Sequence, residues 1–151
     1  MVDIKQLKKL REETAASVAD CRKALEESNG DYQKALEWLK KHGIAKAAKK
    51  EGRETTQGIV DAYIHAGGKV GVLTEISCET DFVARTEDFK KLAHEIGMQI
   101  AAMNPKDVDT LLSQEYIRDP KVTISDLVKQ VIATLGENIK IKRFTRFEIG
   151  E

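Results

Sequence analysis

The chain has 151 residues, of which 41% are hydrophobic and 33% charged, and its 25 basic residues balance 25 acidic ones. This length suits one domain of usual size or two small ones. A general nucleic-acid binder usually carries a basic excess, so the zero net charge argues against direct contact with nucleic acid. The first residues lack the apolar region of a signal peptide, and no run approaches 18 apolar residues. We therefore expect neither secretion nor a membrane span.

Cysteine and histidine are too sparse to build a disulfide framework or a metal site. The two cysteines, Cys21 and Cys78, are far apart in the sequence and are expected to be reduced thiols of a cytoplasmic protein. The three histidines have no metal-ligand spacing, so no metal or cofactor is expected. His65 and Cys78 suggest a nucleophilic pair only superficially, because no third group orients them.

The first part of the chain has the apolar spacing of three short helices. A bundle of about 40 residues is near the lower size limit for an independently stable domain. We predict a three-helix domain over residues 1–43 that resembles the ubiquitin-associated type. Ser17 and Asp20 resemble a capping box at the start of the second helix, and Ser28 to Gly30 are expected to end it. Asp31 is expected to cap the third helix and Gly43 to end it.

Residues 44–56 are rich in alanine and lysine and carry almost no large apolar side chain. We expect a helical extension followed by an extended linker. Four basic residues between Lys46 and Arg53 offer an alternative, contact with RNA. Glu51 and Glu54 interrupt this charge, and no aromatic residue is interleaved for base stacking, which favours a solvated linker.

Residues 57–151 show strand, strand, helix, helix and strand patterns in that order. Val60, Ala62 and Ile64 alternate with polar or aromatic residues, as in a strand. The whole chain is therefore predicted to be α+β, with helices packed on a small antiparallel three-stranded sheet. The segments are residues 60–65, 70–78, 86–104, 123–136 and 139–149, while residues 106–122 lack a clear period.

Gly67 and Gly68 separate the first two strands and predict a hairpin turn. Together with Lys69 they resemble a phosphate-binding loop only in part. The upstream glycine and the Ser or Thr after the lysine are missing. We do not expect the chain to bind GTP itself.

The segment from Glu79 to Arg85 is unusual, because a turn normally calls for Gly, Asn, Pro or Ser. Here Phe82 and Val83 stand beside a carboxylate between a strand and a helix. In one interpretation Thr80 or Asp81 caps a helix and Phe82 enters the core. In the other, the segment is a projecting apolar probe with a charge beside it, offered to a partner.

Three blocks resemble the elongation factor Ts family, the guanine-nucleotide exchange factors of bacterial translation. Residues 75–85, Glu-Ile-Ser-Cys-Glu-Thr-Asp-Phe-Val-Ala-Arg, resemble the core signature of the family. Residues 10–14 and 21–25 resemble its N-terminal motif, and residues 136–139 and 143–147 resemble its C-terminal strand. The blocks stand in the order of the family and span nearly the whole chain.

The resemblance implies that the protein is not an enzyme but binds elongation factor Tu in its GDP form and promotes GDP release. In the family the Asp-Phe pair, here Asp81 and Phe82, inserts beside the Mg²⁺ site of the partner. The residues expected to contact the partner are Thr80, Asp81, Phe82 and Val83, with a second contact through Arg11, Thr14 and Val18 of the first domain. A rival interpretation, a helical interaction module, is supported by residues 1–42 alone.

The chain also departs from the family pattern. The family usually has glycines after the first helix, where Ala15 and Ser17 stand here, and glycine tolerates a positive φ that alanine does not. Members often have two related core subdomains, or one with a long helical insertion, and this chain has room for one subdomain. We therefore expect a homodimer, with apolar patches on the strands as its interface.

Overall fold

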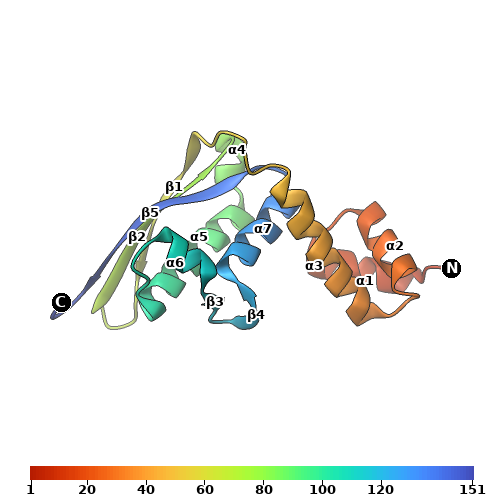
Figure 1. Ribbon diagram of the computed structural model, residues 1–151, viewed down its shortest axis with the longest axis horizontal. Coiled ribbons are helices and arrows are strands. Elements are labelled where there is room, and N and C mark those ends of the chain that lie inside the picture. Colours follow the sequence, from red (N-terminus) through yellow and green to blue (C-terminus); the bar gives the residue numbers. More distant parts are fainter.

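The computed structural model describes residues 1–151. Figure 1 shows an elongated molecule with a helical bundle at the N-terminal end and a sheet covered by helices at the other. Each part has its own cluster of buried apolar side chains. The predicted α+β fold, with N-terminal helices followed by a small antiparallel sheet and packed helices, is confirmed.

The bundle consists of α1 (Ile4–Thr14), α2 (Val18–Glu27) and α3 (Tyr32–Ala48). Each helix begins at a residue whose side-chain oxygen accepts a hydrogen bond from a backbone N–H of the first turn. The capping residues are Asp3, Ser17 and Asp31. The buried side chains between the helices are Leu10, Cys21, Ala24, Leu25, Ala35 and Leu39.

Ala15 ends α1 in the left-handed region, with φ at +53°. Its N–H donates to the carbonyl oxygen of Arg11 at 2.8 Å, so the turn closes without the glycine that is usual in the family. A side chain in this conformation costs about 1 kcal/mol, because its Cβ approaches the next carbonyl oxygen. The turn therefore forms with alanine but is strained.

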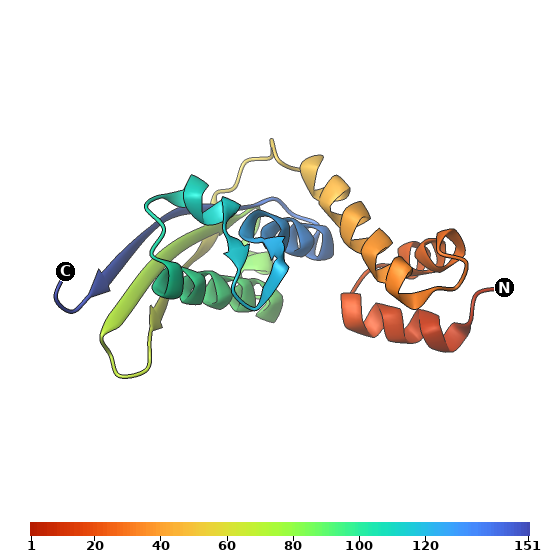
Figure 2. The same cartoon turned by 60° about the horizontal axis from the view of Figure 1, so that its bottom comes forward.

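The third helix does not end at Gly43. It runs on to Ala48, so the predicted stop is wrong. A Cβ at Gly43 would lie 3.4 Å from Cβ of Ala133, because α3 packs closely against α7 (Ile124–Leu135) at this point. Packing of α3 on α7 offsets the weak helix propensity of glycine, about 1 kcal/mol. As Figure 2 shows, α3 thus extends from the bundle to the core.

The segment after α3 is mostly exposed, as in the solvated linker that we expected, and hydrogen bonds also fix it to the core. The Nδ2 atom of Asn138 donates to the carbonyl oxygens of Glu51 and Arg53, at 3.2 and 2.7 Å. Thr55 is buried, and its hydroxyl lies 2.7 Å from that of Ser77. These bonds hold an otherwise exposed stretch against the sheet.

The main sheet has the order β1-β2-β5, with both pairs antiparallel. Its strands are β1 (Gln57–Ile64), β2 (Val70–Cys78) and β5 (Ile139–Glu148). Gly67 and Gly68 have φ angles of +90° and +71° in the loop that joins β1 to β2, a region that glycine adopts without steric cost. The predicted hairpin is confirmed.

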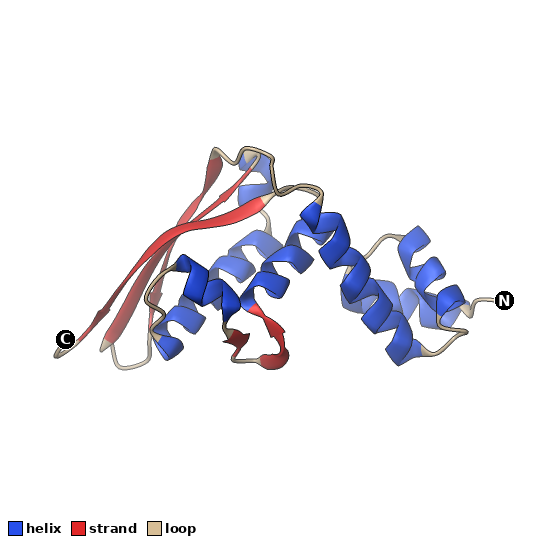
Figure 3. Cartoon of the chain, viewed as in Figure 1, coloured by secondary structure: helices blue, strands red, loops and turns tan.

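Two long helices cover one face of this sheet, α5 (Glu87–Met103) and α7. Thr86 caps α5, and Thr123 with Asp126 forms a complete capping box for α7, so both helices begin where the predicted segments 86–104 and 123–136 begin. Figure 3 shows all helices of the core on the same side of the sheet. The other face carries the apolar alternation of β1, and Val60 and Ile64 are 68% and 65% exposed there.

The segment between α5 and α7, which lacked a period in the sequence, is ordered. It forms α6 (Val108–Ser113) and a short hairpin of β3 (Glu115–Tyr116) and β4 (Asp119–Thr123). These elements are too short to show a hydrophobic period, so the pattern could not reveal them.

Polar side chains of α5 hold the β3–β4 hairpin. Gln99 is completely buried, donates to the carbonyl oxygen of Glu115 at 3.0 Å and accepts from the N–H of Ile117 at 3.0 Å. Glu95 is buried beside Tyr116 and accepts a hydrogen bond from its phenol. Burial and this carboxylate raise the pKa of Tyr116, so its hydroxyl stays protonated as a donor.

Candidate functional site

The segment with Asp81 and Phe82 forms a single helical turn, α4 (Asp81–Ala84), between β2 and α5. Thr80 caps it, because its hydroxyl accepts from the N–H of Val83 at 3.3 Å. Phe82 is 83% exposed, whereas Val83 is only 7% exposed. The capping predicted by the first interpretation is correct, but Phe82 projects into solvent as the second interpretation predicts.

Val83 and Ala84 are buried in the core and fix the inner side of the turn. Successive residues of a helix point about 100° apart, so one neighbour of an exposed residue faces the core. The expected direct contact of Val83 with a partner is therefore not supported, because its side chain is covered. The exposed tip consists of Asp81 and Phe82.

Asp81 forms an ion pair with Arg85, one turn further along the chain. The side chains of Asp81 and Arg85 are 56% and 78% exposed. An exposed pair of this kind contributes only about 0.3–0.5 kcal/mol. The carboxylate of Asp81 can therefore leave Arg85 and bind a group on a partner at a small cost in free energy.

The base of the turn is tied to the end of α7. Glu137 accepts from the backbone N–H of Thr80 at 2.9 Å and from its hydroxyl at 2.8 Å. Glu79 accepts from the N–H of Asn138 at 3.3 Å. The sequence indicated Glu137 and Asn138 only as part of the family resemblance, and their contact with the turn was missed.

The second predicted contact surface lies around the loop between α1 and α2. Arg11 is exposed and Val18 is 47% exposed. Thr14 is half-buried. Its hydroxyl donates to the carbonyl oxygen of Leu10 at 2.7 Å and accepts from the N–H of Ala16 at 3.3 Å. Arg11 and Val18 can reach a partner, whereas the hydroxyl of Thr14 is used within the bundle.

A cleft of about 810 Å³ separates this loop from the helices of the core. Arg11 and Thr14 line it from the bundle, and Lys91 and Gln130 line it from α5 and α7. Phe82 lies outside the cleft. The structure therefore brings Arg11 and Thr14 to one surface but does not bring them together with the exposed tip.

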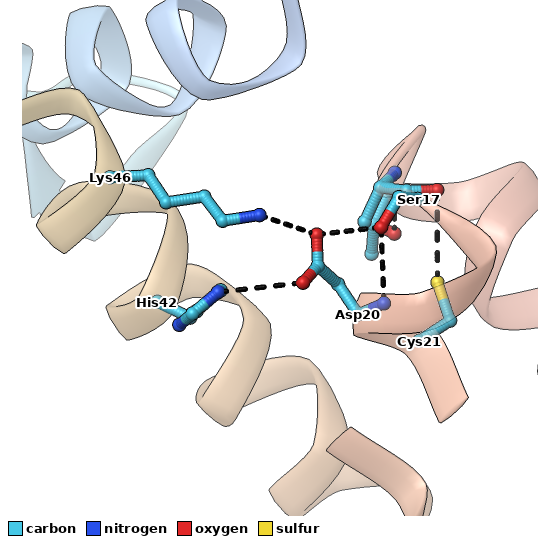
Figure 4. A network of polar contacts seen from close by, with 7 residues as sticks. Ser17, Asp20, Cys21, His42 and Lys46 are labelled. Carbon is cyan, nitrogen blue, oxygen red and sulfur yellow. Dashed lines mark hydrogen bonds and ion pairs between the residues drawn. The ribbon is translucent and has the colours of Figure 1, made fainter. Parts of the chain in front are cut away.

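An ion-pair network connects the bundle to the part of α3 that enters the core (Figure 4). The carboxylate of Asp20 lies 2.7 Å from Nζ of Lys46 and 3.5 Å from Nε2 of His42, and accepts from the hydroxyl of Ser17 at 2.7 Å. Burial raises the pKa of Asp20, but the hydrogen bonds from Lys46 and Ser17 outweigh it and leave the pKa below its ordinary value. This network fixes α2 against α3.

The other residues weighed in the sequence do not form a site. Cys78 and His65 lie at opposite ends of the sheet, where Cys78 pairs with Gln57 and His65 follows the last residue of β1. Cys21 and Cys78 are both buried free thiols, and burial raises the pKa of each. None of the helices has the length and apolar character needed to cross a membrane.

Comparison with known proteins identifies the family. A family model described as elongation factor Ts matches residues 79–151. Elongation factor Ts of Thermoanaerobacter sp. (strain X514) is 44% identical over 196 aligned positions, which cover 100% of this chain and 96% of the relative. Those of Rippkaea orientalis (strain PCC 8801 / RF-1) and Fervidobacterium nodosum (strain ATCC 35602 / DSM 5306 / Rt17-B1) are 43% and 42% identical, over 99% of this chain and 79% and 99% of the relatives.

These matches place the chain in the class of translation elongation factors. The chain belongs to the elongation factor Ts family, and its role lies in translation elongation. The alignments span 195 to 196 positions, whereas this chain has 151 residues, so the relatives carry positions without a counterpart here.

Proposed function

We propose that this protein is a cytoplasmic guanine-nucleotide exchange factor that binds elongation factor Tu in its GDP form and accelerates the release of GDP. One observation carries the proposal. Phe82, a large apolar side chain, is 83% exposed at the tip of a turn whose next two residues are buried. A fixed, exposed aromatic side chain is a typical anchor for a partner surface.

In the proposed mechanism the tip disturbs the site that holds the nucleotide. GDP in such a partner is held by backbone amides, a lysine and Mg²⁺. Phe82 has only two side-chain torsions and can enter a gap between partner helices as a wedge. Asp81 brings a carboxylate that competes for groups orienting the metal or its waters. Since Mg²⁺ requires near-ideal octahedral geometry, a small displacement of these groups weakens its binding.

The exchange follows from coupled binding and needs no covalent step, so the protein is not an enzyme in this proposal. If the factor lowers the affinity of the partner for GDP, GDP lowers the affinity for the factor by the same ratio. A coupling of about 4 kcal/mol corresponds to roughly a thousand-fold change in affinity. The incoming nucleotide then expels the factor.

We assign a second contact to the bundle, through Arg11 and Val18. We propose the functional division into a bundle (1–43), a connecting segment (44–56) and an exchange and dimerisation core (57–151). Because α3 is continuous and packs on α7, the bundle is held at a fixed position relative to the core. Two linked contacts make binding of the second effectively intramolecular, which raises the overall affinity.

The test is release of a fluorescent GDP analogue from elongation factor Tu at saturating factor. The wild-type protein is expected to accelerate release. Phe82→Ala should slow this accelerated release at least ten-fold while binding is largely kept, and Asp81→Ala should have a milder effect. Met103→Ala, which truncates an exposed apolar side chain at the other end of α5, is the matched control. Full exchange by Phe82→Ala would exclude the wedge.

We further propose that two copies of the chain pair through the uncovered face of the sheet. No helix covers this face (Figure 3). Several large apolar side chains are exposed on it or just beyond it: Val60, Ile64, Leu73, Phe147 and Ile149. An uncovered sheet face that carries several exposed apolar side chains is a candidate interface between protein chains. Sedimentation equilibrium should give a dimer for the wild type and a monomer for Leu73→Glu, whereas a wild-type monomer would refute the pairing.

A further inference from the structure

The turn that presents Phe82 is too short to hold its own orientation. It contains four helical residues, and the first turn of a helix orders several residues for a single hydrogen bond. Val83 and Ala84 fix its inner side. The direction of the exposed side therefore depends on what holds the residue before the turn, Thr80.

Thr80 is exposed, yet all its polar groups are engaged within the protein. Its N–H and hydroxyl both donate to the carboxylate of Glu137, one to each oxygen, at 2.9 and 2.8 Å. Its carbonyl oxygen accepts from the thiol of Cys78 at 3.1 Å. Hydrogen bonds to a carboxylate are roughly twice as strong as those between neutral groups. Glu137 is thus the principal external support of the turn.

Glu137 itself is placed by rigid elements. It follows Gly136, whose φ of +78° ends α7, and comes two residues before β5 begins. The next residue, Asn138, is buried and holds the segment after α3 through the carbonyl oxygens of Glu51 and Arg53. Two adjacent residues therefore hold the turn that bears Phe82 and the segment through which the bundle joins the core.

We infer that Glu137 is a positioning residue for nucleotide exchange, acting on Phe82 through Thr80. Both of its carboxylate oxygens are occupied by Thr80, so its effect passes through the orientation of the turn. A turn fixed in one orientation keeps Phe82 directed at the same point of a bound partner, and such positioning favours the exchange step rather than binding itself. This inference rests on the proposed exchange function.

The first experiment is Glu137→Gln, which keeps the shape of the side chain. The amide oxygen can still accept from the N–H of Thr80, but the NH2 group can meet the hydroxyl only as a donor, and both bonds lose the carboxylate charge that strengthens them. We expect amide hydrogen exchange of residues 80–85 to accelerate at least ten-fold, with the remainder of the core unchanged. Thr80→Val removes the hydroxyl, and with it both the bond to Glu137 and the cap on the N–H of Val83, so it should also accelerate the exchange of these amides. Glu26→Gln, at an exposed carboxylate of α2, is the matched control.

The second experiment separates positioning from direct contact. Glu137→Gln should slow GDP release at saturating factor at least ten-fold, while its affinity for nucleotide-free elongation factor Tu changes less than three-fold. If Glu137 acts through Phe82, Phe82→Ala should cost much less in the Glu137→Gln background than alone, because residues acting as a unit are not additive.

The results distinguish failure of the positioning role of Glu137 from failure of the proposed exchange function. Unchanged hydrogen exchange of residues 80–85 in both Glu137→Gln and Thr80→Val would overturn the positioning role, as would fully additive effects on GDP release. A wild-type protein that does not accelerate GDP release would overturn the proposed function instead. Hydrogen exchange would then still show whether Glu137 holds the turn.

Discussion

Replacing Gly58 by alanine should disrupt the sheet, and the structure sets the size of the effect. Gly58 lies opposite Ser77 in the β1–β2 pair, with φ at +150°. A Cβ there would lie 2.0 Å from the carbonyl oxygen of Ile76 and 2.7 Å from Cα of Ser77. Ordinary contacts begin near 3.4 Å. The strands would have to separate by more than about 1 Å, from a normal spacing of about 4.8 Å.

Three costs combine in the Gly58→Ala variant. A non-glycine residue at this φ costs about 1–3 kcal/mol, and forcing an atom into packed surroundings costs about 1–3 kcal/mol. A lost ladder hydrogen bond adds about 1 kcal/mol. Alanine also lowers the conformational entropy of the unfolded chain, which offsets only about 0.4–1 kcal/mol of this loss of stability. We expect a loss of about 2–6 kcal/mol, from a total of roughly 5–15 kcal/mol for a typical domain.

Urea unfolding followed by far-ultraviolet circular dichroism measures this loss, and fluorescence of the single tryptophan, Trp38, separately follows the bundle. The matched control is Gly52→Ala, because a Cβ at Gly52 meets nothing within 4 Å. The circular-dichroism midpoint should fall sharply for Gly58→Ala and stay near that of the wild type for Gly52→Ala. Equal stability of the two variants, within about 0.5 kcal/mol, would refute the close approach of the strands.

Two further predictions concern the bundle, and Trp38 fluorescence in urea measures both. Ala15→Gly relieves about 1 kcal/mol of strain but gives the unfolded chain about 0.4–1 kcal/mol more freedom, so it should be neutral or stabilising by up to about 0.6 kcal/mol. A clear loss of stability would contradict the strained turn. Asp20→Asn should destabilise the bundle by about 1 kcal/mol at pH 7, because it removes the partner of Lys46. Since the pKa of Asp20 is lowered in the folded state, its stabilisation is complete above the unfolded pKa of about 3.9 and is lost as the pH falls through the folded value. The difference in stability between the two proteins should therefore shrink as the pH falls below about 3.9, and a difference that stays constant down to the lowest pH at which both still fold would refute the assignment.

Local signals predicted most element boundaries correctly. Thr86, Thr123 and Gly136 stand at helix ends in the structure as they do in the pattern. Such ends depend on groups a few residues apart, so the sequence alone contains the necessary information. The alternation in β1 likewise predicted a strand, although only the placement of α5 and α7 shows that Val60 and Ile64 lie on the uncovered face.

Long-range contacts account for what the pattern missed. Gly43 resembles a helix stop, but its close packing against Ala133 makes it an interior residue of α3. Gln99 gives no sign in the sequence that it orders the β3–β4 hairpin, because its partners lie 16 to 18 residues away. Hydrogen bonds of this kind are satisfied by whichever group the fold brings near, which no local rule specifies.

For the candidate site, the sequence by itself pointed to the run from Thr80 to Ala84, which is unusual for a turn. The resemblance of the chain to the elongation factor Ts family is confirmed. The sequence left open whether Phe82 is buried or exposed, because the same cap and the same residues suit both. Only the tertiary structure decided this, since burial of Val83 against the core turns its neighbour outward. The support of Thr80 by Glu137, 57 residues further along the chain, likewise exists only once the sheet and α7 have brought these two segments together.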